Sequence, residues 1–153
     1  MKRFLLFTSL LVSTWTISFA QASVSTGHPS LSVDVKRCFA NGQNVYVDMI
    51  FTVNNNWDRV VLENASGDYA SFVFDDEGNS YTNKFYFEID GKSSSYQGWI
   101  DIAPDVPRKM RLVISNVDEY ASSLSLIKLS YSGGYRSTSH HNYIIIKKLP
   151  ISR

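Results

Sequence analysis

The chain has 153 residues, 44% of them hydrophobic and 14% aromatic, and carries 15 Lys and Arg against 14 Asp and Glu. This balance, without a basic stripe, argues against nucleic-acid binding by counterion release. The length is that of one domain, and a single cysteine, Cys38, excludes an internal disulfide. We therefore expect a hydrophobic core to supply the stability.

The first 22 residues are typical of a secretory signal peptide. Lys2 and Arg3 form its charged start, Phe4–Phe19 its mostly apolar segment, and Ala20-Gln21-Ala22 an A-x-A cleavage site. Ser and Thr interrupt the apolar segment and no stop-transfer segment follows, so we expect no membrane span in the mature chain. The sequence predicts export to the periplasm or the extracellular space.

Cleavage would leave a short N-terminal arm at residues 23–30 and one domain at residues 31–153. Loss of Lys2 and Arg3 lowers the basic count from 15 to 13 against 14 acidic residues. The mature chain would therefore be nearly neutral.

From Leu31 onward, apolar residues recur at every second position, which is the spacing of half-buried β-strands. Strands are expected at Leu31–Phe39, Asn44–Val53, Arg59–Glu63, Tyr69–Asp75, Ser80–Ile89, Tyr96–Ala103, Lys109–Val117, Leu124–Ser132 and Asn142–Lys148. Short strands joined by turn-rich segments predict an all-β fold, namely an immunoglobulin-like antiparallel β-sandwich of about seven to nine strands.

The first hairpin has a predicted register. A two-residue Asn41-Gly42 loop would place polar residues of one strand beside apolar residues of the next, which the alternation of side chains forbids when one face is buried. A three-residue loop, Ala40-Asn41-Gly42, restores the match and pairs Val35 with Val47. The same register pairs the residues further along, Val33 with Met49 and Leu31 with Phe51. We expect a positive φ at Gly42.

The acidic stretch Phe74–Tyr81, FDDEGNSY, could be a calcium loop or a turn. If Gly78 were the sixth residue of an EF-hand loop, positions one and twelve would be Val73 and Lys84, where that loop requires carboxylates. A turn with Gly78 left-handed fits better, because charged side chains at a tip remain solvated. We predict a turn, with a weak ion site shared with a second loop as the open alternative.

The residues that commonly carry catalysis form no recognisable motif. His140 and His141 are adjacent and would point to opposite faces of a strand, so they could not readily share a metal. His28 falls in the N-terminal arm, and the neighbours of Cys38 supply no base to activate its thiol. We predict no catalytic residue, no metal site and no cofactor, and hence no enzyme.

Four aromatic residues are the candidate ligand-binding residues: Trp57, Tyr96, Trp99 and Tyr135. They lie in polar or glycine-containing segments, and sugar-binding sandwiches use exposed flat rings of this kind to stack on sugar rings. The other interpretation is that Trp57 and Trp99 close the open ends of the sandwich, since a large ring buries well even when partly exposed.

The order of these segments resembles the immunoprotective extracellular protein family of small secreted bacterial proteins. The resemblance lies in a strand ending at Val53-Asn54, an Asp-x-x-Gly turn before Tyr81, and Ala103-Pro104 before an alternating strand. It spans about residues 31–129 and departs where members have a Pro-Gly turn, because Asp105 follows Pro104 here. The resemblance implies an immunoglobulin-like sandwich and no catalytic residue.

Together these features predict a non-catalytic exported binding or interaction module, because sandwiches carry function in polar loops such as these. The expected partner is an unknown protein or glycan at the cell envelope. One alternative is a carbohydrate-binding module that uses the four aromatic residues. The other is a hydrolase whose site is assembled from loops around His140 or His141.

Overall fold

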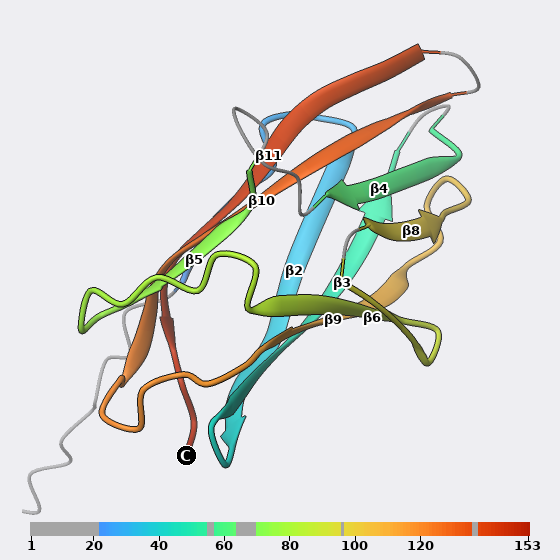
Figure 1. The fold of residues 1–153 in the computed structure, drawn as a ribbon. Coiled ribbons are helices and arrows are strands. Elements are labelled where there is room, and N and C mark those ends of the chain that lie inside the picture. The colour runs from blue at the N-terminus through green and yellow to red at the C-terminus, as the bar shows by residue number, and fades with distance from the viewer. Residues whose placement is uncertain (1–21, 55–56, 64–69, 96, 136–137) are drawn as a thin grey trace, which may run out of the picture.

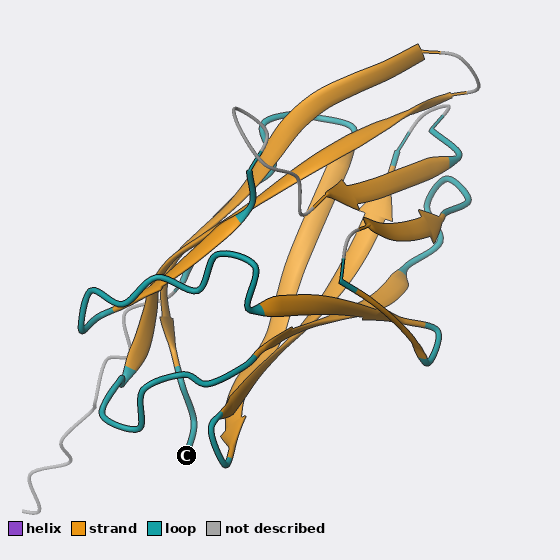
Figure 2. Cartoon of the chain, viewed as in Figure 1, coloured by secondary structure: helices purple, strands orange, loops and turns teal. Residues whose placement is uncertain are grey.

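The computed structural model describes residues 22–54, 57–63, 70–95, 97–135 and 138–153, and this part of the chain contains strands and turns but no helix (Figure 2). Its eleven strands are β1 (Ser23–Ser25), β2 (Leu31–Asn41), β3 (Asn44–Val53), β4 (Arg59–Glu63), β5 (Phe72–Asp75), β6 (Phe85–Ile89), β7 (Lys92–Ser94), β8 (Gln97–Asp101), β9 (Arg108–Ile114), β10 (Ser123–Tyr135) and β11 (Thr138–Pro150). The predicted all-β sandwich is confirmed. The sequence missed two strands, β1 and β7, each of three residues.

Two antiparallel sheets form the sandwich (Figure 1). One has the order β2-β3-β9-β6-β7, and the other has the order β1-β11-β10-β4-β8, with β5 also paired to β10. Seven of these strands follow the arrangement of an immunoglobulin domain, whose strands are lettered A to G in chain order. Strands β2-β3-β9-β6 correspond to its sheet A-B-E-D, and β4-β10-β11 correspond to its sheet C-F-G.

The core lies between the sheets and is built by alternation. In β3, every second residue from Val45 to Val53 is buried, and the intervening ones are half-buried on the outer face. The largest fully buried side chains of the core are Tyr131, Phe51, Phe87 and Met49. Removal of this apolar surface from water stabilises the fold, as the sequence pattern predicts.

The register of the first hairpin differs from the prediction. The loop has two residues, Gly42 and Gln43, with Asn41 opposite Asn44, and a bulge at Lys36 shifts the pairing so that Val35 lies opposite Met49 rather than Val47. Before the bulge Leu31 and Val33 face the core, and after it Cys38 does. The extra residue that preserves the alternation therefore lies inside β2 and not in the loop. The predicted positive φ at Gly42 is confirmed, at +61°.

Strands β4 and β5 both pair with β10. The first half of β10 pairs with β5, and the second half of β10 pairs with β4. Ser71 precedes β5 and is fully buried. Its hydroxyl donates to the carbonyl of Glu63 and accepts a 2.7 Å hydrogen bond from the amide of Ser130. A side chain thus completes the hydrogen bonding where neither strand supplies a backbone partner.

Both ends of the domain are attached to the sheets. The predicted N-terminal arm contains β1, which pairs with β11, and the Tyr131 hydroxyl donates to the Thr26 carbonyl at 2.7 Å. At the other end, the Ser152 amide donates to the Cys38 carbonyl at 3.0 Å and the Ala40 amide to the Ser152 carbonyl at 2.8 Å. The chain therefore leaves β11 and finishes against the edge of the opposite sheet.

Candidate functional site

Trp57 is buried, with 7% of its surface exposed. Its ring lies 4.8 Å from the His28 ring and 6.3 Å from that of Tyr131, measured between centroids. A Cβ atom on Gly133 would come within 2.3 Å of the indole, so the glycine makes room for it. Trp57 is part of the core, as the end-closing interpretation predicts, and offers no free face to a sugar.

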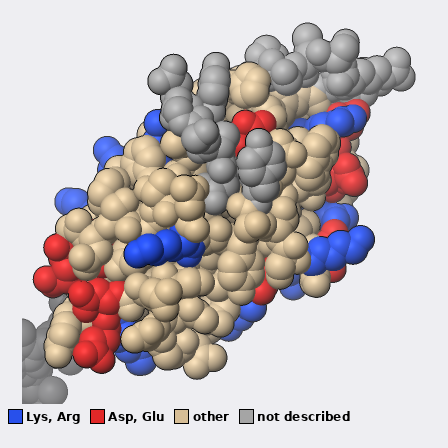
Figure 3. All heavy atoms as spheres, viewed as in Figure 1, with Lys and Arg blue, Asp and Glu red and all other residues tan. Residues whose placement is uncertain are grey.

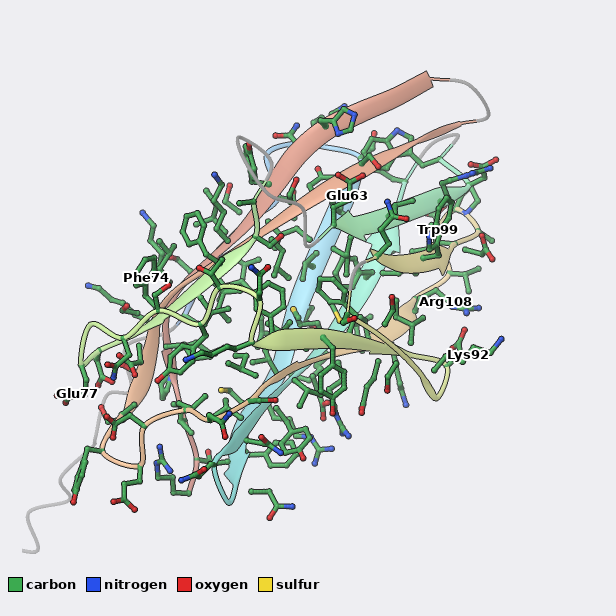
Figure 4. All side chains as sticks on the ribbon, viewed as in Figure 1. Glu63, Phe74, Glu77, Lys92, Trp99 and Arg108 are labelled. Carbon is green, nitrogen blue, oxygen red and sulfur yellow. The ribbon has the colours of Figure 1, made fainter. Side chains whose placement is uncertain are left out.

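Trp99 is different, because 55% of its surface is exposed on the outer face of β8 (Figure 4). The guanidinium carbon of Arg59 lies 5.9 Å from its ring centroid. Trp57 and Trp99 lie on opposite sides of the same sheet and do not form one site. Tyr96 and the side chain of Tyr135 lie outside the described residues.

The acidic stretch forms the turn between β5 and β6, with Gly78 at φ +87° and Glu77 exposed at its tip (Figure 4). Acidic side chains gather at this end of the molecule, at the lower left of Figure 3. Asp75, however, is only 2% exposed. Its carboxylate accepts hydrogen bonds from the Tyr81 hydroxyl at 2.6 Å and from the amide and side chain of Asn79 at 2.8 and 2.9 Å.

The same turn is fastened to the β9–β10 loop. The Tyr81 hydroxyl accepts a 3.1 Å hydrogen bond from the Asp118 amide, and the Asp76 carboxylate accepts from the amides of Ser122 and Ser123 at 3.0 and 3.1 Å. The carboxylates of Asp75 and Asp76 are thus engaged in the hydrogen bonds that join the two loops. The described residues contain no cluster of three or more His, Cys, Asp or Glu side chains suited to a metal.

Hydrogen bonding sets the pKa of the groups in this cluster. Burial raises the pKa of Asp75, but the hydrogen bonds from Tyr81 and Asn79 outweigh it and hold the pKa below its usual value. Burial and the bond to Asp75 raise the pKa of Tyr81 to about 12. Both shifts keep Asp75 charged and Tyr81 protonated, the pairing that the 2.6 Å bond requires.

Of the three histidines, His28 and His141 have described side chains. The His28 ring packs on Trp57, and its Nδ1 accepts a hydrogen bond from the Ser30 amide at 3.1 Å. His141 is exposed on β11, and the side chain of His140 lies outside the described residues. Burial raises the pKa of the Cys38 thiol to about 12, which disfavours the reactive thiolate.

A groove of about 670 Å³ lies on the outer face of the β2–β3–β9–β6 sheet. Charged side chains from all four strands border it, and four of them form a single row across the sheet: Arg37, Asp48, Arg111 and Glu88. We call these four residues the charged row. The register places each directly beside the next, so positive and negative charges alternate.

Ion pairs hold the charged row in order. Asp48 accepts hydrogen bonds from Arg37 and from Nε and Nη2 of Arg111, the latter two at 2.6 and 3.3 Å. Arg111 Nη1 also lies 3.7 Å from the Glu88 carboxylate. Burial raises the pKa of Asp48, but the hydrogen bonds and charges of the two arginines outweigh this and lower it.

An aromatic row lies two residues further along the same strands and comprises Phe39, Tyr46, Val113 and Tyr86. The Phe39 and Tyr46 rings are stacked, with centroids 5.2 Å apart. Arg37 lies 4.7 Å from the Phe39 centroid and Arg111 5.5 Å from that of Tyr46. Cation–π contacts therefore join the aromatic row to the charged row.

Sequence reasoning missed this face. Alternation places Asp48 and Tyr46 on the outer side of β3, and this much could have been read from residues 44–53. The partners Arg111, Val113 and Glu88 come from strands far along the chain, and Arg37 reaches the row because of the bulge at Lys36.

Comparison with family models, with curated proteins and with solved structures found no match. Within the described residues there is no helix long and apolar enough to cross a membrane.

Proposed function

We propose that this protein is a non-catalytic exported binding module that takes a protein partner through its charged row and aromatic row. One observation carries the proposal: two arginines and the stacked rings of Phe39 and Tyr46 are packed together on an outer sheet face beside the groove, with Tyr86 in the same row. Arg and Tyr are enriched among the residues that dominate protein–protein affinity.

The arrangement also suits binding energetically. Side chains that must be fixed on association lose conformational freedom, which weakens the complex. Here Arg111 is already held by Asp48 and Tyr46 in the free protein, and only 33% of its side chain is exposed. A partner would therefore meet a largely pre-ordered surface.

The test is capture of proteins from the native envelope fraction with the mature domain as bait. Tyr46→Ser and Tyr86→Ser should each weaken retention of a captured protein about tenfold or more, as expected for central interface residues. Trp99→Ala, on the other sheet, is the matched control and should leave retention unchanged. Thermal unfolding of each variant checks that the fold is intact, and equal retention by all of them would refute the proposal.

A carbohydrate-binding function is the second candidate, and the exposure of Trp99 favours it. Because Trp57 is buried, stacking would centre on Trp99 with Arg59 beside it. Calorimetric titration with a panel of soluble glycans should then show binding that Trp99→Ala abolishes and Tyr46→Ser does not. Absence of heat from every glycan would remove this candidate.

A further inference from the structure

The order of charges in the charged row is its own complement. Read from β2 to β6, the signs run plus, minus, plus, minus for Arg37, Asp48, Arg111 and Glu88. Read in the opposite direction they run minus, plus, minus, plus. Two copies of the row laid face to face in opposite directions therefore place every charge against an opposite one.

We propose that the partner of this face is a second copy of the same chain, related by a two-fold axis that runs parallel to the strands between β3 and β9. This inference rests on the proposed function of the face. Such an axis gives an isologous interface, in which Arg37 faces Glu88 of the second copy and Asp48 faces its Arg111, each pair occurring twice.

The aromatic row selects the same axis. Rotation about a line parallel to the strands leaves each row at its own height, so the aromatic row meets its counterpart. Phe39 lies opposite Tyr86, and Tyr46 lies opposite position 113, where the valine is already buried within its own chain. A two-fold axis running across the strands would instead set each charge against itself, which is repulsive. The strands of the two copies would run nearly parallel, as in aligned packing of sheets.

The charge content of the face also favours a second copy. The charged row contains two cations and two anions, so a partner carrying one sign of charge would be repelled by half of it. Acidic side chains nearby are paired within the chain, Asp34 with Lys36 and Asp90 with Arg108. Strands lie 4.7–4.9 Å apart, so the four charges span about 14 Å, and complementarity over that length fixes the register.

The experiment is sedimentation velocity of the mature domain from micromolar to millimolar concentration. The wild-type protein should form a dimer that weakens with added salt. R37E and E88R should each weaken self-association at least about tenfold, because each substitution creates like-charge contacts across the axis. An equimolar mixture of R37E and E88R should dimerise again, because position 37 of one variant then faces an opposite charge at position 88 of the other in both symmetric contacts.

Lys92→Glu on β7 and Glu77→Arg at the acidic turn are the matched controls, since they make the same changes in charge away from the charged row and should leave dimerisation intact. A wild-type monomer at millimolar concentration, variants that dimerise like the wild type, or a mixture that stays monomeric would each overturn the proposal. If the protein is monomeric while Tyr46→Ser still loses a captured envelope protein, the second copy is ruled out and the proposed function stands.

Discussion

Asp75 and Tyr81 form a buried pair that joins three segments of the chain. The carboxylate accepts a hydrogen bond from the Tyr81 hydroxyl, and the same hydroxyl accepts one from the Asp118 amide. Removing either partner leaves a buried polar group without its hydrogen bond, which costs about 1–3 kcal/mol. The pair should therefore contribute to the pH dependence of stability at both extremes.

Because the pKa of Asp75 is lowered in the folded protein, its stabilising contribution is complete above the unfolded value of about 4 and is lost as the pH falls below it. Tyr81 behaves in the opposite sense. Its folded pKa of about 12 lies above the unfolded value, so its contribution is complete below about pH 10 and is lost as the pH rises toward 12.

Urea unfolding at a series of pH values tests this. Asp75→Asn should lower the free energy of unfolding at neutral pH by about 1–3 kcal/mol and flatten its decline below about pH 4. Tyr81→Phe should reduce the decline that sets in above about pH 10, to which Tyr131 also contributes because burial raises its pKa to about 12. Glu77→Gln, at the exposed tip, is the control. Parallel curves for Asp75→Asn and the wild type would contradict the assignment.

At the level of single residues, alternation with Ile100 places Trp99 on the outer face of its strand, but no local pattern predicts that Trp57, in the polar run NNNWD, is buried. The burial comes from Gly133, 76 positions further along the chain than Trp57, which leaves the space that the indole fills. Contacts of this kind depend on tertiary packing and are invisible to periodicity.

Among the secondary-structure elements, the β2–β3 hairpin shows both the reach and the limit of sequence pattern. Arg59–Glu63 matches β4 at both ends, but the predicted three-residue loop was wrong, because the structure has a two-residue loop and takes up the extra residue as a bulge at Lys36. Alternation alone does not say where the extra residue goes, because a bulge anywhere in β2 restores the inward face. The charged row was missed for this reason, since Arg37 belongs to it only after the bulge.

The turn of this hairpin supplies a prediction. Gly42 has a positive φ while Gln43 does not, as in a type II′ turn, and nothing lies within 4 Å of a Cβ built on Gly42. Gly42→Ala should therefore lower the free energy of unfolding by about 1 kcal/mol through backbone strain alone. Chemical denaturation measures this, with Gln43→Ala as the adjacent control. No loss of stability on Gly42→Ala would show that this turn adopts another conformation.

Over the whole molecule, the last three residues act as a strap between the sheets. The Ile151 amide donates to the Ser122 carbonyl at 2.9 Å, and Ser152 exchanges backbone hydrogen bonds with the edge of β2. Arg153 donates to the carbonyls of Asp118 and Ala121 at 2.7 and 2.9 Å. The strap thus links β2, at the edge of one sheet, to the loop that enters β10 in the other.

Deletion of residues 151–153 should lower the free energy of unfolding by about 2–4 kcal/mol, since several hydrogen bonds of about 1 kcal/mol each are lost together. Arg153→Ala keeps the backbone bonds and should cost less than half as much. Equilibrium denaturation of the two variants compares them. If the deletion is no more harmful than Arg153→Ala, the backbone of the strap contributes nothing.

Cys38 lies beside this strap and is only 5% exposed, and its carbonyl accepts a hydrogen bond from the Ser152 amide. It is the one thiol in the chain. A small alkylating reagent reaches the sulfur when the end of β2 separates from its cover, so the rate of labelling under native conditions reports the population of that open form. Mass spectrometry of the alkylated protein therefore follows local opening at the edge of the sandwich, and no engineered probe is needed.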